Sequence, residues 1–212
     1  MAFSQEGLLG DFSGRIGNLV VYKLKGKTVI RSMPAVKRGP ARGRLKQTQD
    51  GFSRVMTVLR GLKAFVKVGF HDFAGGDYVF QRALSENLKR YHSAGSSAGL
   101  DWLLLSAGER AGTQQLSLEV NGISATIKWG EPEPDKSWSE NDMVMVLALN
   151  TSSLQSTHKS SAARRSQGQT TLPLPPAKEG ERIRVFVAFM HLEGRMTGLS
   201  PKNISDSQWV EP

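Results

Sequence analysis

The pattern of apolar and polar positions divides the chain into a short strand-rich start, a helical middle and a long strand-rich remainder. In the first part, residues 18–24 and 27–32 are two runs rich in β-branched and aromatic side chains, on either side of Lys25-Gly26. Runs of this kind around a glycine-bearing pair are typical of a β-hairpin. We therefore expect a hairpin over residues 18–32.

Two amphipathic helices are expected next. Residues 33–44 are rich in proline, glycine and basic side chains, which predicts a loop or an extended arm. From about residue 45 to 68, apolar residues recur at helical spacing. A second stripe of this kind runs over residues 78–92, after Gly75-Gly76-Asp77. Two such helices joined by a short glycine-bearing connection predict a helical hairpin.

The rest of the chain is typical of a β-sandwich. It follows a serine- and glycine-rich connection at 93–99 and a short apolar segment, 102–105, that we expect to be buried. Strands are expected near residues 116–120, 123–129, 143–149, 155–160, 169–174, 182–190 and 195–199. Seven short strands at this spacing favour a sandwich of two antiparallel sheets.

Part of this region resembles a fibronectin type III module. Residues 123–132, Ile-Ser-Ala-Thr-Ile-Lys-Trp-Gly-Glu-Pro, are similar to the second strand of that module, which ends in a core tryptophan before a proline-bearing loop. Residues 171–201 are similar to its last three strands, although Ile183 stands where the family has its corner tyrosine. Because such modules are usually binding or spacer domains, the resemblance favours a role other than catalysis and names no ligand.

The chain as a whole resembles an uncharacterised bacterial family of about this length. The motifs that carry the resemblance are a Gly-x-x-Gly-Asn turn at 14–18, an Arg-x-x-Pro exit at 31–34, the basic helix from about residue 45 and the C-terminal strands. The family brings no established activity. The expected fold class is α+β: a β-hairpin and a helical hairpin in a region 1–100, followed by a fibronectin- or Ig-like β-sandwich in a domain 101–212.

Composition excludes several classes of protein. The 212 residues include no cysteine, so disulfides, thiolate metal sites and cysteine nucleophiles are excluded. The apolar fraction of 39% and the mean hydropathy of −0.32 are ordinary for a globular protein. No apolar run is long enough to span a membrane, and the first ten residues lack the basic and apolar regions of a secretory signal. Localisation stays open, with the cytoplasm, or a particle assembled there, as the default.

Positive charge is concentrated near the start of the chain. Residues 15–67 hold 14 lysines and arginines and one acid, Asp50, whereas the whole chain has a net charge of +9. Residues 101–212 hold 11 basic and 13 acidic residues. A chain polarised in this way presents one cationic end to an acidic partner, or to an acidic surface of itself or of another copy.

No catalytic site is predicted. Gly26-Lys27-Thr28 resembles the end of a phosphate-binding loop, but Val21 stands where that motif needs glycine, and a strand follows where it needs a helix. The four histidines lack metal-ligand spacing. The acids of residues 131–142 are interleaved with Pro132 and Pro134, which favours a solvated loop. We expect a non-enzymatic protein with no metal, no cofactor and no small-molecule substrate.

The basic segment 23–46 is the candidate partner-binding site. Its residues are Lys23, Lys25, Lys27, Arg31, Lys37, Arg38, Arg42, Arg44 and Lys46. It has three interpretations: a subunit contact in a filament or particle, a surface for nucleic acid phosphates, or an ordinary solvated surface. Tyr22 is the single aromatic ring there, so base stacking is poorly provided for. Because acids gather in the other half of the chain, we favour self-association, with sequence-independent nucleic acid binding as the alternative.

Overall fold

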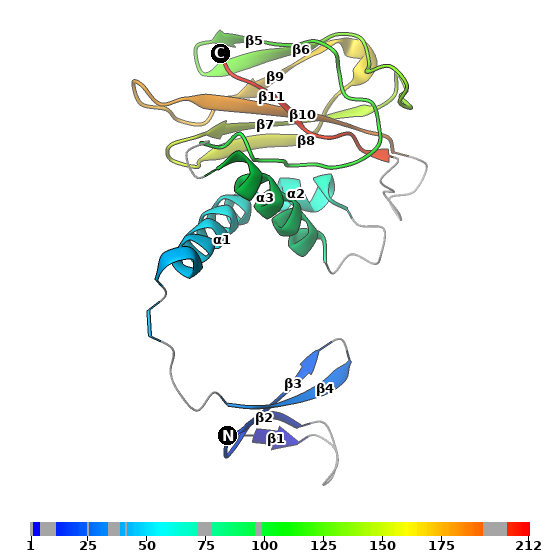
Figure 1. Cartoon of the computed structure of the whole chain (residues 1–212). Coiled ribbons are helices and arrows are strands. Elements are labelled where there is room, and N and C mark those ends of the chain that lie inside the picture. Colours follow the sequence, from blue (N-terminus) through cyan, green and yellow to red (C-terminus); the bar gives the residue numbers. More distant parts are fainter. Residues whose placement is uncertain are drawn as a thin grey trace. The chain divides into compact units, whose positions relative to one another are not determined.

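A computed structural model describes residues 2–4, 12–24, 26–33, 39–40, 42–71, 78–95, 99–192 and 203–212 (Figure 1). Strands near the N-terminus are followed by helices and then by two antiparallel sheets, which confirms the α+β class. The chain forms two compact units, Met1–Lys46 and Gln47–Pro212. Each unit is described on its own below.

The first unit is an antiparallel sheet with the strand order β1-β2-β3-β4. Its strands are β1 (Ala2–Ser4), β2 (Phe12–Ile16), β3 (Leu19–Leu24) and β4 (Lys27–Ser32). The expected hairpin is confirmed as β3 and β4, which pair from Leu19 opposite Ser32 to Leu24 opposite Lys27. Gly26 has a φ of 73° in the turn, a backbone conformation that favours glycine. Strands β1 and β2 extend the hairpin beyond the prediction.

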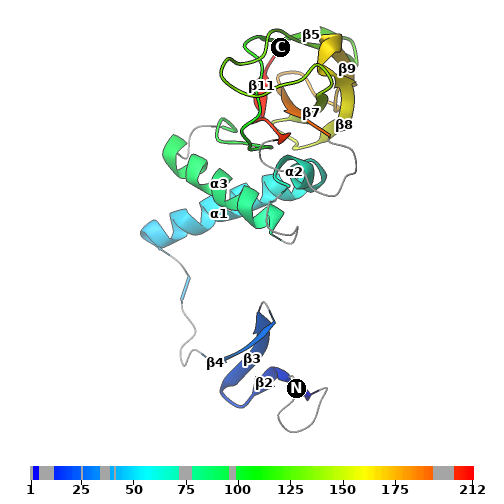
Figure 2. The same cartoon turned by 90° about the vertical axis from the view of Figure 1, so that its right-hand side faces the viewer.

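The helical region contains α1 (Gly43–Gly61), α2 (Lys63–Gly69) and α3 (Val79–Ala94). The single helix expected over 45–68 is divided at Leu62, whose φ and ψ of −106° and 14° are not helical. Helices α1 and α3 cross each other (Figure 2). They pack together at Gly51, where an added Cβ would lie 2.7 Å from a ring carbon of Tyr91. The glycine therefore permits the close contact between the two helices.

Two sheets form the C-terminal sandwich. The three-stranded sheet has the order β5-β6-β9, and the four-stranded sheet has the order β11-β10-β7-β8. The strands are β5 (Leu116–Asn121), β6 (Ser124–Trp129), β7 (Met143–Asn150), β8 (Ser156–Arg164), β9 (Gln169–Pro173), β10 (Ile183–Met190) and β11 (Gln208–Val210). Six expected strands are confirmed, and the one expected at 195–199 lies outside the described residues. The edge strand β11 was not predicted.

The sandwich encloses its own hydrophobic core. Buried side chains of β6 and β9 meet one set of side chains from β7 and β10, including Val144, Val187 and Phe189. Trp129 is buried here, as its position at the end of the second expected strand predicted, and packs edge-on against Phe189 with 6.0 Å between ring centroids. This core joins the two sheets.

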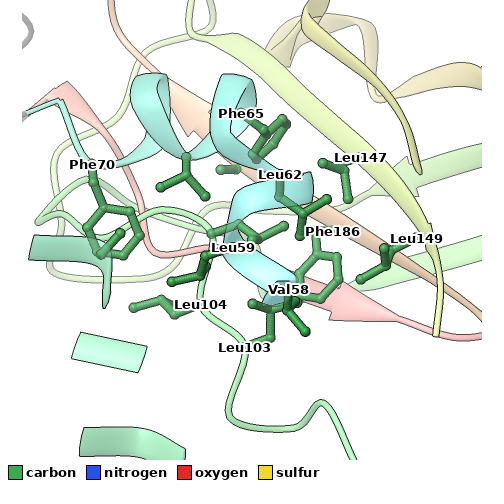
Figure 3. Close-up of a cluster of buried hydrophobic side chains, with 14 of the residues drawn as sticks. Val58, Leu59, Leu62, Phe65, Phe70, Leu103, Leu104, Leu147, Leu149 and Phe186 are labelled. Atoms are coloured by element: carbon green, nitrogen blue, oxygen red, sulfur yellow. The ribbon is translucent and has the colours of Figure 1, made fainter. Parts of the chain in front are cut away.

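The helices share a second core with the opposite face of the four-stranded sheet. Leu147, Leu149 and Phe186 point away from the sandwich core and pack against helical residues such as Leu59 and Phe65 (Figure 3). The unit Gln47–Pro212 therefore has three layers: helices, four-stranded sheet and three-stranded sheet (Figure 1). The predicted division at residue 100 assigned the helices to the N-terminal region, whereas their buried side chains form one cluster with the sheet.

The apolar segment 102–105 connects α3 to the sheet layers. Its four side chains are buried, as expected. Asn87 on α3 is fully buried and holds the backbone of Leu104 from both sides: its Oδ1 accepts from the Leu104 N–H at 2.8 Å, and its Nδ2 donates to the Leu104 carbonyl at 2.9 Å. These bonds satisfy a buried backbone that belongs to no helix or strand.

Candidate functional site

Six of the nine candidate residues can be placed in the structure. Lys23 lies on β3, Lys27 and Arg31 on β4, Arg42 before α1, and Arg44 and Lys46 in the first turn of α1. All six are exposed. Lys25, Lys37 and Arg38 lie outside the described residues. The whole set belongs to the unit Met1–Lys46, which holds ten basic and two acidic residues.

The strand register separates this sheet into two chemically different faces. Directly opposite residues of antiparallel strands lie on the same face, and successive residues alternate between faces. Arg15 is opposite Val20, which is opposite Arg31, and Leu24 is opposite Lys27. One face therefore carries Arg15, Lys27 and Arg31, and we call it the basic face.

The basic face also carries Tyr22, the aromatic ring that directly precedes the candidate segment. Tyr22 lies between Val20 and Leu24 on β3 and is opposite Val29. The guanidinium carbon of Arg31 lies 5.8 Å from the centre of the Tyr22 ring, within the range of a cation–π contact. The cations on this sheet face can pair with the negative charges of a polyanion, and the half-buried Tyr22 ring can stack against planar groups that such a polyanion carries.

The other face is apolar at its centre. Val21 is opposite Ile30, and Ile16 is opposite Leu19, so these four side chains share a face, which we call the apolar face. Ile16, Leu19 and Ile30 are 49%, 45% and 62% exposed. Lys23 is on this face too, opposite Thr28. The sequence interpretation treated all the basic residues as one surface, and the register shows that Lys23 is separated from Lys27 and Arg31.

The described residues of the N-terminal sheet bury little apolar surface. Among the described residues of Met1–Lys46, Val21 is the one buried apolar side chain. A small sheet in water is stable when an apolar face is packed against something else. Contiguous exposed apolar side chains on a sheet are a recognised mark of a contact surface. The apolar face therefore has the exposed apolar side chains that are typical of a contact surface.

The acidic loop that was expected to be solvated is partly buried, and that prediction is wrong for Asp142. Its side chain has no exposed surface. It accepts from Arg110 Nε at 2.7 Å and from Arg110 Nη2 at 2.6 Å, and His191 Nδ1 lies 3.0 Å from its Oδ1. Asp142 therefore neutralises buried cations and offers nothing to a partner.

Arg165 extends this buried network. Its Nη1 donates to the carbonyl of Ala111 at 3.0 Å, its Nη2 donates to the carbonyl of Gly112, and its guanidinium carbon lies 4.0 Å from the centre of the Phe189 ring. Burial lowers the pKa of Arg165, while the charge of Asp142 acts in the opposite direction. The network fixes the loop to the sandwich and is a structural feature.

Glu133 is also held in place. Partial burial acts to raise the pKa of its carboxyl group, but hydrogen bonds from Lys136 Nζ at 2.8 Å and from the Gly112 N–H at 3.3 Å hold that pKa below its usual value. The same pairing raises the pKa of Lys136. The acids of this loop that stay exposed are Glu131, Asp135 and Glu140.

No group of three or more histidine, aspartate or glutamate side chains that could hold a metal ion occurs among the residues described. No helix within those residues is both long and apolar enough to cross a membrane.

Fold and surface together define an α+β protein with a basic N-terminal sheet and a helix-covered β-sandwich. The chain belongs to a family of unknown function (DUF6266), which matches residues 11–200. This confirms the expected membership of an uncharacterised family. Comparisons with curated proteins and with solved structures found no match. The fibronectin likeness therefore stays a resemblance in sequence.

Proposed function

We propose that this protein is a non-enzymatic structural subunit that self-associates through its N-terminal unit, Met1–Lys46, to build a larger assembly such as a filament or particle. The observation that carries the proposal is the apolar face, on which Ile16, Leu19 and Ile30 are exposed around Val21, the one buried apolar side chain among the described residues of this unit. A second copy is the occupant that we infer for this face.

A contact between two apolar faces fits the physics of sheet packing. Two sheets packed face to face lie about 10 Å apart, with their side chains interdigitated. Full burial of an aliphatic side chain contributes about 1.5–3 kcal/mol, so each half-exposed one adds about 1 kcal/mol when it is covered. Such a contact is isologous and closes as a dimer. It also leaves both basic faces in solvent.

The charge distribution supplies a second contact that extends the dimer. The N-terminal unit has a net charge of +8, and the remaining residues, with 18 basic and 17 acidic side chains, have +1. The basic face and the basic residues that follow it complement the exposed acids Glu131, Asp135 and Glu140 of another copy. A head-to-tail contact of this type joins different surfaces of two copies, so it produces a ring where the rotation closes and an extended assembly where it does not.

Sedimentation velocity of matched charge variants tests the apolar contact. Ile30→Glu places a carboxylate on the apolar face, and Leu24→Glu places one on the basic face of the same hairpin at a similarly exposed position. We expect Ile30→Glu to weaken the closed dimer at least tenfold, because association would bury a charge. Leu24→Glu should retain that dimer. Equal behaviour of the two variants, or a wild type that is monomeric at high concentration, contradicts the proposal.

The alternative is sequence-independent binding of nucleic acid on the basic face. The specific observation in its favour is the contact between Arg31 and Tyr22 beside Lys27 and Arg15. Phosphate contacts make such binding fall steeply with salt, with a logarithmic slope of about 0.7–0.9 for each neutralised phosphate. Fluorescence anisotropy with a labelled oligonucleotide should show that slope decrease by about 1–2 in Lys27→Gln/Arg31→Gln. No binding at low salt excludes this function.

A further inference from the structure

A cavity of about 600 Å³ is lined by residues of the unit Gln47–Pro212. One wall is formed by α1 through Ser53 and Arg54, and another by the turn between β7 and β8 through Thr151 and Ser152. Arg182, just before β10, completes the wall. Small-molecule sites in proteins have volumes of about 300–1,000 Å³, so this cavity has the size of a ligand site.

Arg184 gives the cavity a buried charge. It lies on β10, on the side of the sheet that faces the helices, and only 7% of its surface is exposed. Its Nε donates to Glu211 at 2.8 Å, its Nη2 donates to Asp101 at 2.9 Å, and its guanidinium carbon lies 3.7 Å from the centre of the Trp209 ring. The guanidinium is therefore held firmly in one orientation.

One donor of this guanidinium is unmatched. Arg184 Nη1 is buried and has no hydrogen-bond partner among the described residues. Buried polar atoms in folded proteins nearly always have partners, so this donor lacks an acceptor that the described residues do not supply. The residue that carries it lines the cavity.

The lining carries three arginines and two acids. Arg184 is paired with Glu211 and with Asp101, so the remaining lining cations are Arg54 and Arg182, which share the cavity with Asp50. Arg54 is positioned by a hydrogen bond from its Nη2 to the Gly99 carbonyl at 3.2 Å. Arginine presents a planar set of donors that matches carboxylate and phosphate groups.

We propose that this cavity binds a small ligand through a carboxylate or phosphate group, with Arg54 and Arg182 at the entrance and Arg184 at the base. The hydroxyl groups of Ser53 and Ser152 line the same cavity and can donate further hydrogen bonds to the anion. Such a site could not be predicted from the sequence, because its residues come from five separate segments of the chain. The proposal does not depend on self-association.

Thermal unfolding of the full chain, titrated with sodium phosphate or sodium succinate at constant ionic strength, tests this site. A ligand that binds only the folded state raises the unfolding temperature in a saturable way. We expect saturation with at least one of the two anions, and the one that saturates at lower concentration identifies the preferred group. Sodium chloride at matched ionic strength should not reproduce the effect.

Two double variants with equal change of charge complete the experiment. Arg54→Gln/Arg182→Gln removes the cations at the entrance, and Arg60→Gln/Arg90→Gln removes two exposed arginines that do not line the cavity. For each variant, the change in unfolding temperature is calculated from that variant's own value without added anion. The first pair should raise the half-saturating concentration at least tenfold, and the second should leave it unchanged. Equal effects of the two pairs, or no saturation with either anion, would overturn the proposal.

Discussion

Asp142 shows how much of this molecule's stability depends on a single side chain. It is fully buried and contacts Arg110, whose own side chain is 7% exposed. Removing one partner of a buried ion pair leaves an uncompensated charge in the interior, at a cost of about 3–5 kcal/mol. We expect Asp142→Asn to lower the free energy of unfolding by that amount, measured by urea denaturation.

Asp135→Asn is the matched control for this change. Asp135 is exposed in the same loop, and its φ of 62° is a conformation that asparagine also tolerates. The control should change the stability by less than about 0.5 kcal/mol. If both variants are equally stable, the buried network does not hold the loop to the sandwich.

Gly69 carries a second prediction at this scale. A Cβ added at Gly69 would collide with the carbonyl oxygen of Leu105, which belongs to the backbone and cannot rotate away. Gly69→Ala should therefore destabilise the protein by about 1–3 kcal/mol or more. Gly61→Ala is the control, because no atom lies within 4 Å of the added Cβ. Thermal unfolding of the two variants measures the difference, and equal melting temperatures would contradict the close approach.

Residue types could be read from the sequence more easily than their surroundings. The exposed basic residues of the N-terminal unit were predicted, since charged side chains in strands usually face water. The burial of Asp142 could not be predicted, because Arg110 and His191 lie 32 and 49 positions away and neighbouring acids and prolines are typical of a loop. The apolar face was missed because membership of a face depends on the strand register.

At the scale of elements, most helices and strands could be located from their periodicity. The strands β7 and β10 carry continuous apolar runs, which is the pattern of strands buried on both faces. The pattern therefore predicts a layer on each face of the four-stranded sheet. In the structure, the helices are the layer on the face opposite to the sandwich core. The break at Leu62 directly follows Gly61, and the low helix propensity of glycine was a sign of it in the sequence. The three-residue strand β11 could not be predicted, since it is too short to create a clear period.

The shared core predicts that the sandwich does not fold without the helices. A fragment 101–212 would expose the helix-facing side chains of β7 and β10, including Leu147, Leu149 and Phe186. We expect this fragment to aggregate or to unfold without a cooperative transition, whereas a fragment 47–212 should melt cooperatively. Circular dichroism and size-exclusion chromatography distinguish the two. A monomeric 101–212 fragment with a sharp transition would mean that the helices are a separate addition to a stable sandwich.

At the scale of the whole molecule, we propose different roles for the two units. The unit Gln47–Pro212 has extensive cores, and the unit Met1–Lys46 has exposed apolar side chains and most of the net charge. A unit with its own cores has little need of a partner, whereas a small sheet with exposed apolar side chains gains stability when another surface covers it. The N-terminal unit is therefore where we expect association to be controlled.

Salt and truncation together test this division. At about 1 M salt the screening length falls to about 3 Å, so contacts between exposed charges weaken while apolar packing persists. We expect the full chain to form large species at low salt and a dimer at high salt, and fragment 47–212 to be monomeric at both, as light scattering can measure. If 47–212 associates as the full chain does, the contact lies in the sandwich unit. If the large species persist at high salt, charge complementarity is not what extends the assembly, and the basic face has another partner.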